Sequence, residues 1–398
     1  LKSENAASGF KQKLQGAAGA LKGLAGAVGL GVGMYQLQGF LRDATREAVQ
    51  FEAQLTNVTS LLKEPVSTSE VEQWGKTLKR VAIETGQDLH GLAEAQYEAV
   101  SSGIAVGKSL EAVEISAKMA VAGLTDTQTT MNMMTSALNT YADEQVNANQ
   151  VADEFFKMVR IGRGTAQDFA QALPMVAGSA HAAGISLNEL STAMAIASTK
   201  MPNAQISATG LRSALAQIAK PSAEAAKLTS ELGIEWGAAA LENKGLIATL
   251  NDAYKALGNK ASRMRDLIPE TEAYAAAVVL LGDDVVQMAQ DTKDATGEME
   301  NAFKKNSQTT AQELAKAQQA WTVFKEEIGR SVLVELKPWL EDLTELFRRA
   351  AGGSNSFLDE LRRLSLTVDI TAHSIEGLGK VLKAITWQIG RASCRERV

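Results

Sequence analysis

Apolar residues recur at intervals of three and four along most of the chain, the spacing that places them on one face of an α-helix. Period-two runs of β-branched and aromatic residues, which are typical of strands, are almost absent. The pattern therefore predicts an all-α protein. The clearest early case is residues 41–62, whose predicted buried face holds Leu41, Ala44, Ala48, Phe51, Leu55, Val58 and Leu62.

Individual residues predict where the first helices begin and end. Pro65 predicts the end of the first one. Ser67 and Glu70 have the spacing of a capping box, in which each side chain satisfies a free amide of the first turn. The helix that they begin is expected to stop at Thr85 and Gly86.

Two segments of the sequence are similar to each other. Residues 92–141 and 169–218 align without a gap at an offset of 77, and 12 of the 50 pairs are identical. The two copies predict one helical packing module used twice. The retained residues are Ala, Gly, Ser, Leu and Gln, which suit turns, caps and core positions and include no acid or base for catalysis.

The shared Gly-x-Ser-Leu segment predicts the turn inside each copy. Gly107 and Gly184 suit a helix C′ position with positive φ. Ser109 and Ser186 are placed to cap the next helix, and Ser186 with Glu189 has capping-box spacing. The leucine that follows is expected to open the buried face.

The C-terminal third predicts long amphipathic helices. One is expected to start near Thr310, to be kinked or restarted at Pro338, and to be followed after "AGGSNS" by a last helix from about Phe357. Its apolar spacing is heptad-like but short for a coiled coil. The heptad-spaced residues are Leu314, Trp321 and Ile328, with Phe324 between them.

These patterns divide the chain into five predicted parts. The helical core is expected to carry the two-copy repeat and to be flanked by extended helices. The parts are a Gly/Ala-rich apolar segment (1–40), the core (41–258), a polar helical or linker region (259–310), long amphipathic helices (311–388) and a tail that looks non-native (389–398).

The glycine-rich segment leaves two interpretations open. Gly19 and Gly23, like Gly29 and Gly33, have the small-xxx-small spacing that lets helices approach closely in a membrane. The uncharged run from Gly23 to Tyr35 is, however, shorter than the ~20 residues that span a bilayer. Residues 14–40 are either a partner-dependent apolar segment or a site of membrane insertion or helix assembly.

Composition narrows the class of protein. A net charge of −6 argues against nucleic-acid binding as the main role, because phosphate contacts need a basic face. The single cysteine, Cys394, excludes an internal disulfide framework and a cysteine metal cluster. It lies in the Arg-rich ending 389–398, which resembles a cloning adaptor, with a genuine basic tail as the alternative. The start at Leu1 is expected of a fragment or a processed chain.

The sequence offers no legible catalytic, cofactor or metal site. The three histidines, His90, His181 and His373, have no second ligand at metal-binding spacing. The G-x-G in "RIGRGT" (160–165) is better explained as a turn in which Thr165 and Asp168 cap the next helix. "MNMM" (131–134) is expected to fill the core. The acidic pairs 143–144 and 283–284 are expected to be solvated.

Several segments resemble the core of the phage tail tape measure protein family over roughly residues 40–350, in their order and spacing rather than in any one motif. The segments are "FEAQLTNVTSLL", "AIETGQDLHGLAEAQYEAVSSGI", "AGLTDTQTTMNMMTSALNTYA", "VADEFFKMVRIGRGTAQDFAQALPMVAGSAHAAGISLNEL", "ISATGLRSALAQIAKPS" and "GRSVLVELKPWLEDL".

This resemblance implies a non-enzymatic structural protein of the virion that sets tail length, supports tail tube assembly and is ejected with the genome. It implies a place in the tail tube lumen, after assembly in the host cytoplasm. The implied partners are tail tube protein, tail assembly chaperones, tail tip proteins and further copies of the chain, with possible host membrane contact through the glycine-rich segment. No cofactor and no specific nucleic-acid binding are implied.

Three alternatives stay open at this point. The first is a helical-repeat scaffold or binding module unrelated to phage, which predicts a larger regular array. The second is a membrane-active helical protein that uses residues 14–40. The third is an enzyme such as a peptidoglycan hydrolase, which nothing in these residues supports.

Overall fold

The computed structural model describes residues 34–292 and 294–351, and within these ranges it contains helices and no strand. The all-α prediction is therefore confirmed. The elements are α2 (Met34–Ser60), α3 (Thr68–Thr85), α4 (Leu89–Ser101), α5 (Val106–Gly123), α6 (Thr127–Thr140), α7 (Ala148–Ile161), α8 (Ala166–Ala182), α9 (Leu187–Lys200), α10 (Ala204–Ala219), α11 (Ala223–Glu231), α12 (Ala238–Lys244), α13 (Leu246–Ala256), the 3-10 helix η1 (Ala261–Asp266), α14 (Thr271–Val278), α15 (Asp283–Asp291), α16 (Glu298–Asn306) and α17 (Thr310–Ala351).

Several predictions fall wholly or partly outside the described residues. They concern the glycine-rich segment up to residue 33, the last helix from Phe357, His373, and the ending 389–398 with Cys394. Residues 34–40 of the glycine-rich segment form the start of α2.

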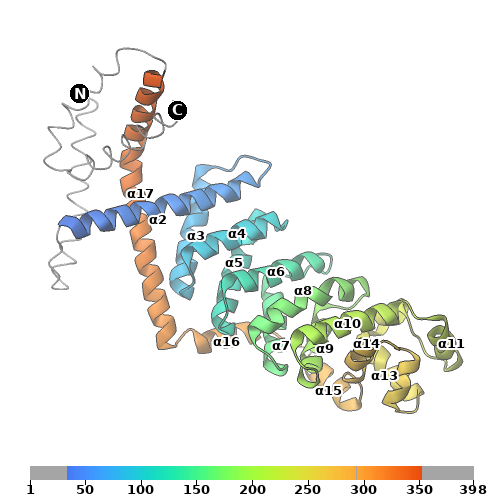
Figure 1. Cartoon of the computed structure of the whole chain (residues 1–398). Helices are drawn as coiled ribbons and strands as arrows, with labels where there is room; N and C mark the ends of the chain where they lie inside the picture. Colours follow the sequence, from blue (N-terminus) through green and yellow to red (C-terminus); the bar gives the residue numbers. More distant parts are fainter. Residues whose placement is uncertain (1–33, 293, 352–398) are drawn as a thin grey trace, which may run out of the picture. The chain divides into compact units, whose positions relative to one another are not determined.

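The larger compact unit, residues 50–323, is built on two layers of helices. In the first layer α4, α6, α8, α10 and α14 pack side by side, and in the second layer α3, α5, α7 and α9 do the same. Figure 1 shows α4, α6, α8 and α10 following one another in a row. We call the helices α3–α10 the array, because the chain alternates between the two layers along them.

The array has a period of one helix pair. The first-layer helices begin at Leu89, Thr127, Ala166 and Ala204, which are 38, 39 and 38 residues apart. The 77-residue offset in the sequence therefore contains two helix pairs. That the two 50-residue segments are copies of one module stays a prediction, whereas the spacing of the helices is a property of the fold.

The first-layer helices have capping residues and buried residues at equivalent positions. The residue before each helix accepts a hydrogen bond from the backbone N–H three positions later, at 2.8 to 3.1 Å. Buried residues then recur at equal steps. The capping residues are Asp88, Asp126, Thr165 and Asn203; eight positions later lie Gln96, Met134, Leu173 and Leu211; eleven positions later lie Ala99, Ala137, Val176 and Ala214.

Two of the predicted capping boxes are present. Ser67 and Glu70 form one at the start of α3, and Thr165 and Asp168 form one at the start of α8. The α3 helix ends, as predicted, at Gly86, which has φ +67°. Both boxes involve residues three positions apart, so local spacing was enough to find them.

The predicted turn of the repeat is right in the second copy and wrong in the first. Gly184 has φ +77°, and Ser186 caps α9. Gly107 and Ser109, by contrast, lie inside α5, and the buried Ser109 hydroxyl donates to the Val106 carbonyl. The position of the glycine that ends the preceding helix explains the difference.

The turn of the first copy comes earlier because Gly103 ends α4. It adopts φ +93°, a conformation that glycine tolerates and most other residues do not. The residue 77 positions later is Ala180, so α8 continues to Ala182. As a result α4 is shorter than α8, and α5 begins earlier than α9 at the same offset.

The restart predicted at Pro338 does not occur. The α17 helix runs from Thr310 to Ala351 without interruption. A proline removes one backbone donor and crowds the preceding turn, which weakens a helix locally but need not end one this long.

The smaller unit contains residues 1–49 and 324–398, of which 34–49 and 324–351 are described. Here α2 and α17 cross closely. Gly329 of α17 lies against the backbone of Ala44, and the Lys325 ammonium is 2.8 Å from the Glu47 carboxylate. The rings of Phe40 and Phe324 lie 6.3 Å apart, so apolar and charged contacts both hold this crossing.

We expect Gln96→Leu to stabilise the protein. The Gln96 side chain is fully buried, and neither its Oε1 nor its Nε2 has a hydrogen-bond partner within the described part of the chain. Its equivalents in the next helices are Met134 and apolar residues of similar size. Removing the unpaired amide should raise the free energy of unfolding by about 1–2 kcal/mol, measured by urea denaturation. Gln171→Leu, on the exposed face of α8, is the control and should change it by less than about 0.5 kcal/mol. Destabilisation by Gln96→Leu would contradict the argument.

Candidate functional site

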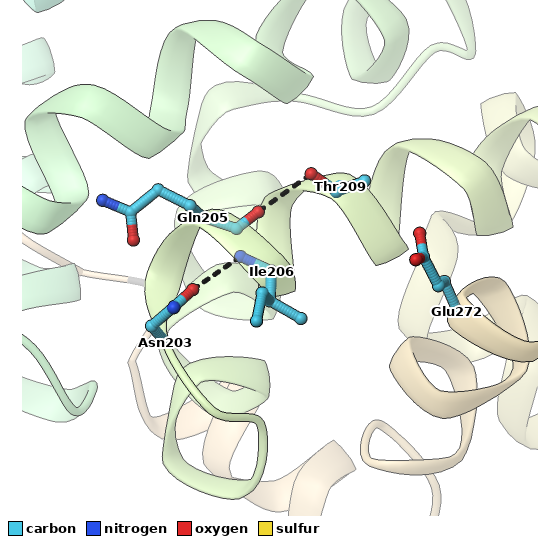
Figure 2. A pocket seen from close by; sticks show the side chains of 5 residues that line it. All are labelled: Asn203, Gln205, Ile206, Thr209 and Glu272. Carbon is cyan, nitrogen blue, oxygen red and sulfur yellow. Dashed lines mark hydrogen bonds between the residues drawn. The ribbon is translucent and has the colours of Figure 1, made fainter.

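The cavities of the described residues are shallow. The hollow in Figure 2, of about 460 Å³, is lined by Asn203, Gln205, Ile206, Thr209 and Glu272. Two of its polar side chains bond within α10 and its cap: Asn203 accepts from the Ile206 N–H at 2.8 Å, and the Thr209 hydroxyl donates to the Gln205 carbonyl at 3.0 Å. The arrangement brings no acid and base together, so it offers surface and no evident chemistry.

The histidines of the described part lie in small polar contacts. His181 Nε2 is 2.8 Å from Asp143 Oδ1, and its ring meets the edge of Tyr141. The hydrogen bond from His181 lowers the pKa of Asp143, which is exposed. His90 Nδ1 lies 2.8 Å from Gln54 Oε1. Within residues 34–292 and 294–351, no group of three potential metal ligands occurs.

The other residues considered for chemistry take structural places. Met131, Met133 and Met134 are fully buried, as expected for core residues. The Asp283 carboxylate lies in the first turn of α15, 3.1 Å from Lys255 Nζ. Residues 160–161 end α7, and residues 162–165 form the connection to α8.

A buried charged cluster joins α7 to α9, and no pattern in the sequence predicted it. Lys157 is fully buried, and its Nζ lies 2.5 Å from Glu154 Oε2 and 3.1 Å from the Asn188 carbonyl. The Glu154 carboxylate also accepts from Ser191 Oγ and Asn188 Nδ2. Burial lowers the pKa of Lys157, and the nearby Glu154 carboxylate opposes that effect.

Elements outside the array pack along it: α13 precedes α14 in the chain, and α15, α16 and the start of α17 follow it. The α13 and α15 helices pack together, α15 packs on α9, and α16 packs on α7 and α5. The first residues of α17 then reach the junction of α3 and α4, where the Gln312 amide donates to the Thr85 carbonyl and the Leu89 N–H donates to Gln319 Oε1. We call α13, α15, α16 and residues 310–323 of α17 the return segment.

Carboxylates of the array cap helices of the return segment. Asp153 of α7 accepts the backbone N–H groups of Gly297 and Met299, both at 3.0 Å, at the start of α16. Glu189 of α9 accepts the N–H of Ile247 at 3.0 Å, at the start of α13. The box predicted for Ser186 and Glu189 is thus only half formed, because the serine caps α9 while the carboxylate caps another helix.

The exposed surface of the first layer is the candidate interaction face. Tyr97 of α4, Met175 of α8 and Ile206 of α10 are each about 40% exposed, at 41%, 39% and 43%. Around them uncharged polar side chains predominate on α6 and α8: Gln128, Asn132, Asn139, Gln167 and Gln171 are exposed. The face suits contact with other proteins better than contact with nucleic acid.

Membrane contact was predicted through residues 14–40, of which 14–33 are not described. Within the described ranges, no helix combines the length and the apolar content needed to cross a bilayer.

Comparison with known proteins identifies what the chain is similar to. The family model of phage-related minor tail proteins matches residues 70–321. The chain is 27% identical over 219 residues to the tape measure protein of Pneumococcus phage Dp-1, covering 54% of this chain and 18% of that protein. It is 22% identical over 368 residues to the probable tape measure protein of Clostridium phage phiCD119, covering 87% of this chain and 39% of that protein. The chain thus spans well under half the length of these relatives. No solved structure matches.

Proposed function

Because the chain belongs to the family of phage-related minor tail proteins, and with it to the tape measure proteins, we propose that it is a section of a protein that sets tail length and supports tail tube assembly. As a member of this family it is a structural component of the phage tail and associates with other tail components. The observation that carries the proposal is the position of the family match, residues 70–321. It covers almost all of the helical unit 50–323.

The length of the helices supports a role in setting tail length. An α-helix advances about 1.5 Å per residue, so the 42 residues of α17 correspond to roughly 63 Å of length. Stacked helix pairs advance only about 10 Å per pair, since that is the distance between packed helix axes. Long helices would therefore set most of the distance, and the array would be a compact section along it.

The finer assignments belong to the same proposal. The protein would lie in the tail tube lumen of the virion after assembly in the host cytoplasm, and would leave with the genome. Its partners would be tail tube protein, tail assembly chaperones, tail tip proteins and further copies of itself. The uncharged polar side chains on α6 and α8 support protein contacts, and the helical unit supports a role without catalysis. Host membrane contact through residues 14–40 remains the alternative role for that segment.

Tail length in a phage that carries this gene tests the ruler. Deleting residues 324–351, the part of α17 in the smaller unit, removes 28 helical residues. Tails should shorten by about 42 Å at about 1.5 Å per residue, measured by electron microscopy of many particles. A second deletion of half this length should have half the effect. Tails of unchanged length would contradict the proposal, as would shortening that is not proportional to the residues removed.

A further inference from the structure

The α15 and α16 helices bury very little. Each has nine residues and one buried side chain, Val285 in α15 and Met299 in α16, and α16 also packs the partly buried Phe303 against the core. By contrast, α5 and α9, on which they pack, each have ten buried residues. The two helices therefore contribute little apolar burial of their own while they cover the most apolar helices of the second layer.

Polar contacts hold α16 in place. Its N-terminus is capped by Asp153, and its C-terminal Asn306 donates through Nδ2 to the Ala122 carbonyl at 2.6 Å. Arg160 of α7 lies 2.8 Å from Glu298, but the arginine side chain is 54% exposed, so this ion pair contributes little. Each contact is a single cap or pair that can break without disturbing the packing of the array.

The α15 helix is attached in the same way. The Gly282 N–H at its start donates to Asn251 Oδ1 at 2.8 Å, and Asp283 pairs with Lys255. The Asn251 side chain is buried in α13, which Glu189 anchors to α9. The firm attachment of the return segment thus ends at α13 and residue 282, just before α15.

We propose that α15 and α16 form a strap that opens while the array stays folded, and that opening bares the apolar surface of α5, α7 and α9. Segments with few fully buried apolar side chains, held by single polar contacts that are only partly buried, open at lower free energy than the core of a fold. Because the anchors at both ends of the strap lie on α13 and α17, opening would leave the chain attached on either side.

Cysteine labelling of the full chain tests the strap. In a Cys394→Ser background, which removes the only native thiol, Met299→Cys reports opening of α16 and Met134→Cys reports opening of the array core. Met299 is 5% exposed and Met134 is fully buried. With a bulky thiol reagent in native buffer, we expect the residue 299 thiol to react at least about 100-fold faster, since only sub-global opening is required.

Removing the Asp153 cap of α16 tests whether labelling at position 299 depends on opening of the strap or on exposure in the closed state. Asp153→Ala should raise the labelling rate at position 299 about fivefold, the usual effect of losing a helix cap, and leave the rate at position 134 unchanged. Asp168→Ala is the matched control: it removes a cap of α8 that does not touch the strap, and should leave the rate at position 299 unchanged. Equal labelling rates at the two thiols would overturn the proposal, as would an Asp153→Ala effect of equal size on both.

Discussion

Gly329→Val is expected to separate α2 from α17 and to destabilise the smaller unit by about 3 kcal/mol. A Cβ at this position would overlap the backbone carbonyl of Ala44. Because the obstacle is backbone, no change of side-chain rotamer can relieve it, and the helix axes must move apart. The Glu47–Lys325 ion pair and the Phe40–Phe324 contact should weaken together. Hydrogen exchange of residues 34–49 and 324–351 would measure the loss.

Gly39→Ala in α2, the other helix of this crossing, is the control for this variant. A Cβ at Gly39 would meet no atom within 4 Å. Alanine is also favoured over glycine inside a helix, so this change should stabilise α2 by about 0.5–1 kcal/mol. Unchanged protection of α2 and α17 in Gly329→Val would show that the two helices do not cross closely.

Lys157→Met is expected to destabilise the larger unit by about 3 kcal/mol, because it leaves the Glu154 carboxylate buried without its cation. Lys227 provides the control, since its pairing with Glu231 is a 3.8 Å contact between two exposed side chains. Lys227→Met should change the free energy of unfolding by less than about 0.5 kcal/mol. Adding Glu154→Gln to Lys157→Met should recover part of the loss, as the remaining amide can still bond to Ser191 and Asn188. Urea denaturation measures all three, and a near-zero effect of Lys157→Met would exclude a buried pair.

The same lysine predicts a dependence on pH. Burial lowers the pKa of Lys157 below its ordinary value of 10.5, so in the interval between the two values the unfolded chain binds more protons than the folded one. Stability contributed by this group should therefore rise with pH as 10.5 is approached from below. Lys157→Met should remove that contribution, seen as a difference in slope between the two proteins over this interval.

Local spacing predicted the features that depend on neighbouring residues. The Ser67–Glu70 and Thr165–Asp168 boxes are formed by side chains three positions apart, and both were found in the sequence. Contacts across the fold gave no such signal. Asp153 caps a helix 144 residues away, and Glu189 caps one 58 residues away, so neither carboxylate differs in sequence from an ordinary surface residue.

In the sequence, similarity was visible only between segments two helix pairs apart, although the array repeats with every pair. Buried positions keep size more than identity, as the series Gln96, Met134, Leu173 and Leu211 illustrates. Identity between segments is therefore visible at 77 residues and not at 38 or 39. The first copy departs from the second because one glycine, Gly103, ends a helix that Ala180 allows to continue.

The alternation of α4–α10 between two layers restricts how such a chain can change in length. Inserting one helix into the array would send every later helix to the opposite layer and turn its apolar face toward water. Adding or removing a whole pair of about 38 residues keeps each later helix in its own layer. We therefore expect natural variants of this region to differ by even numbers of helices, so that helix pairs are gained or lost as whole units.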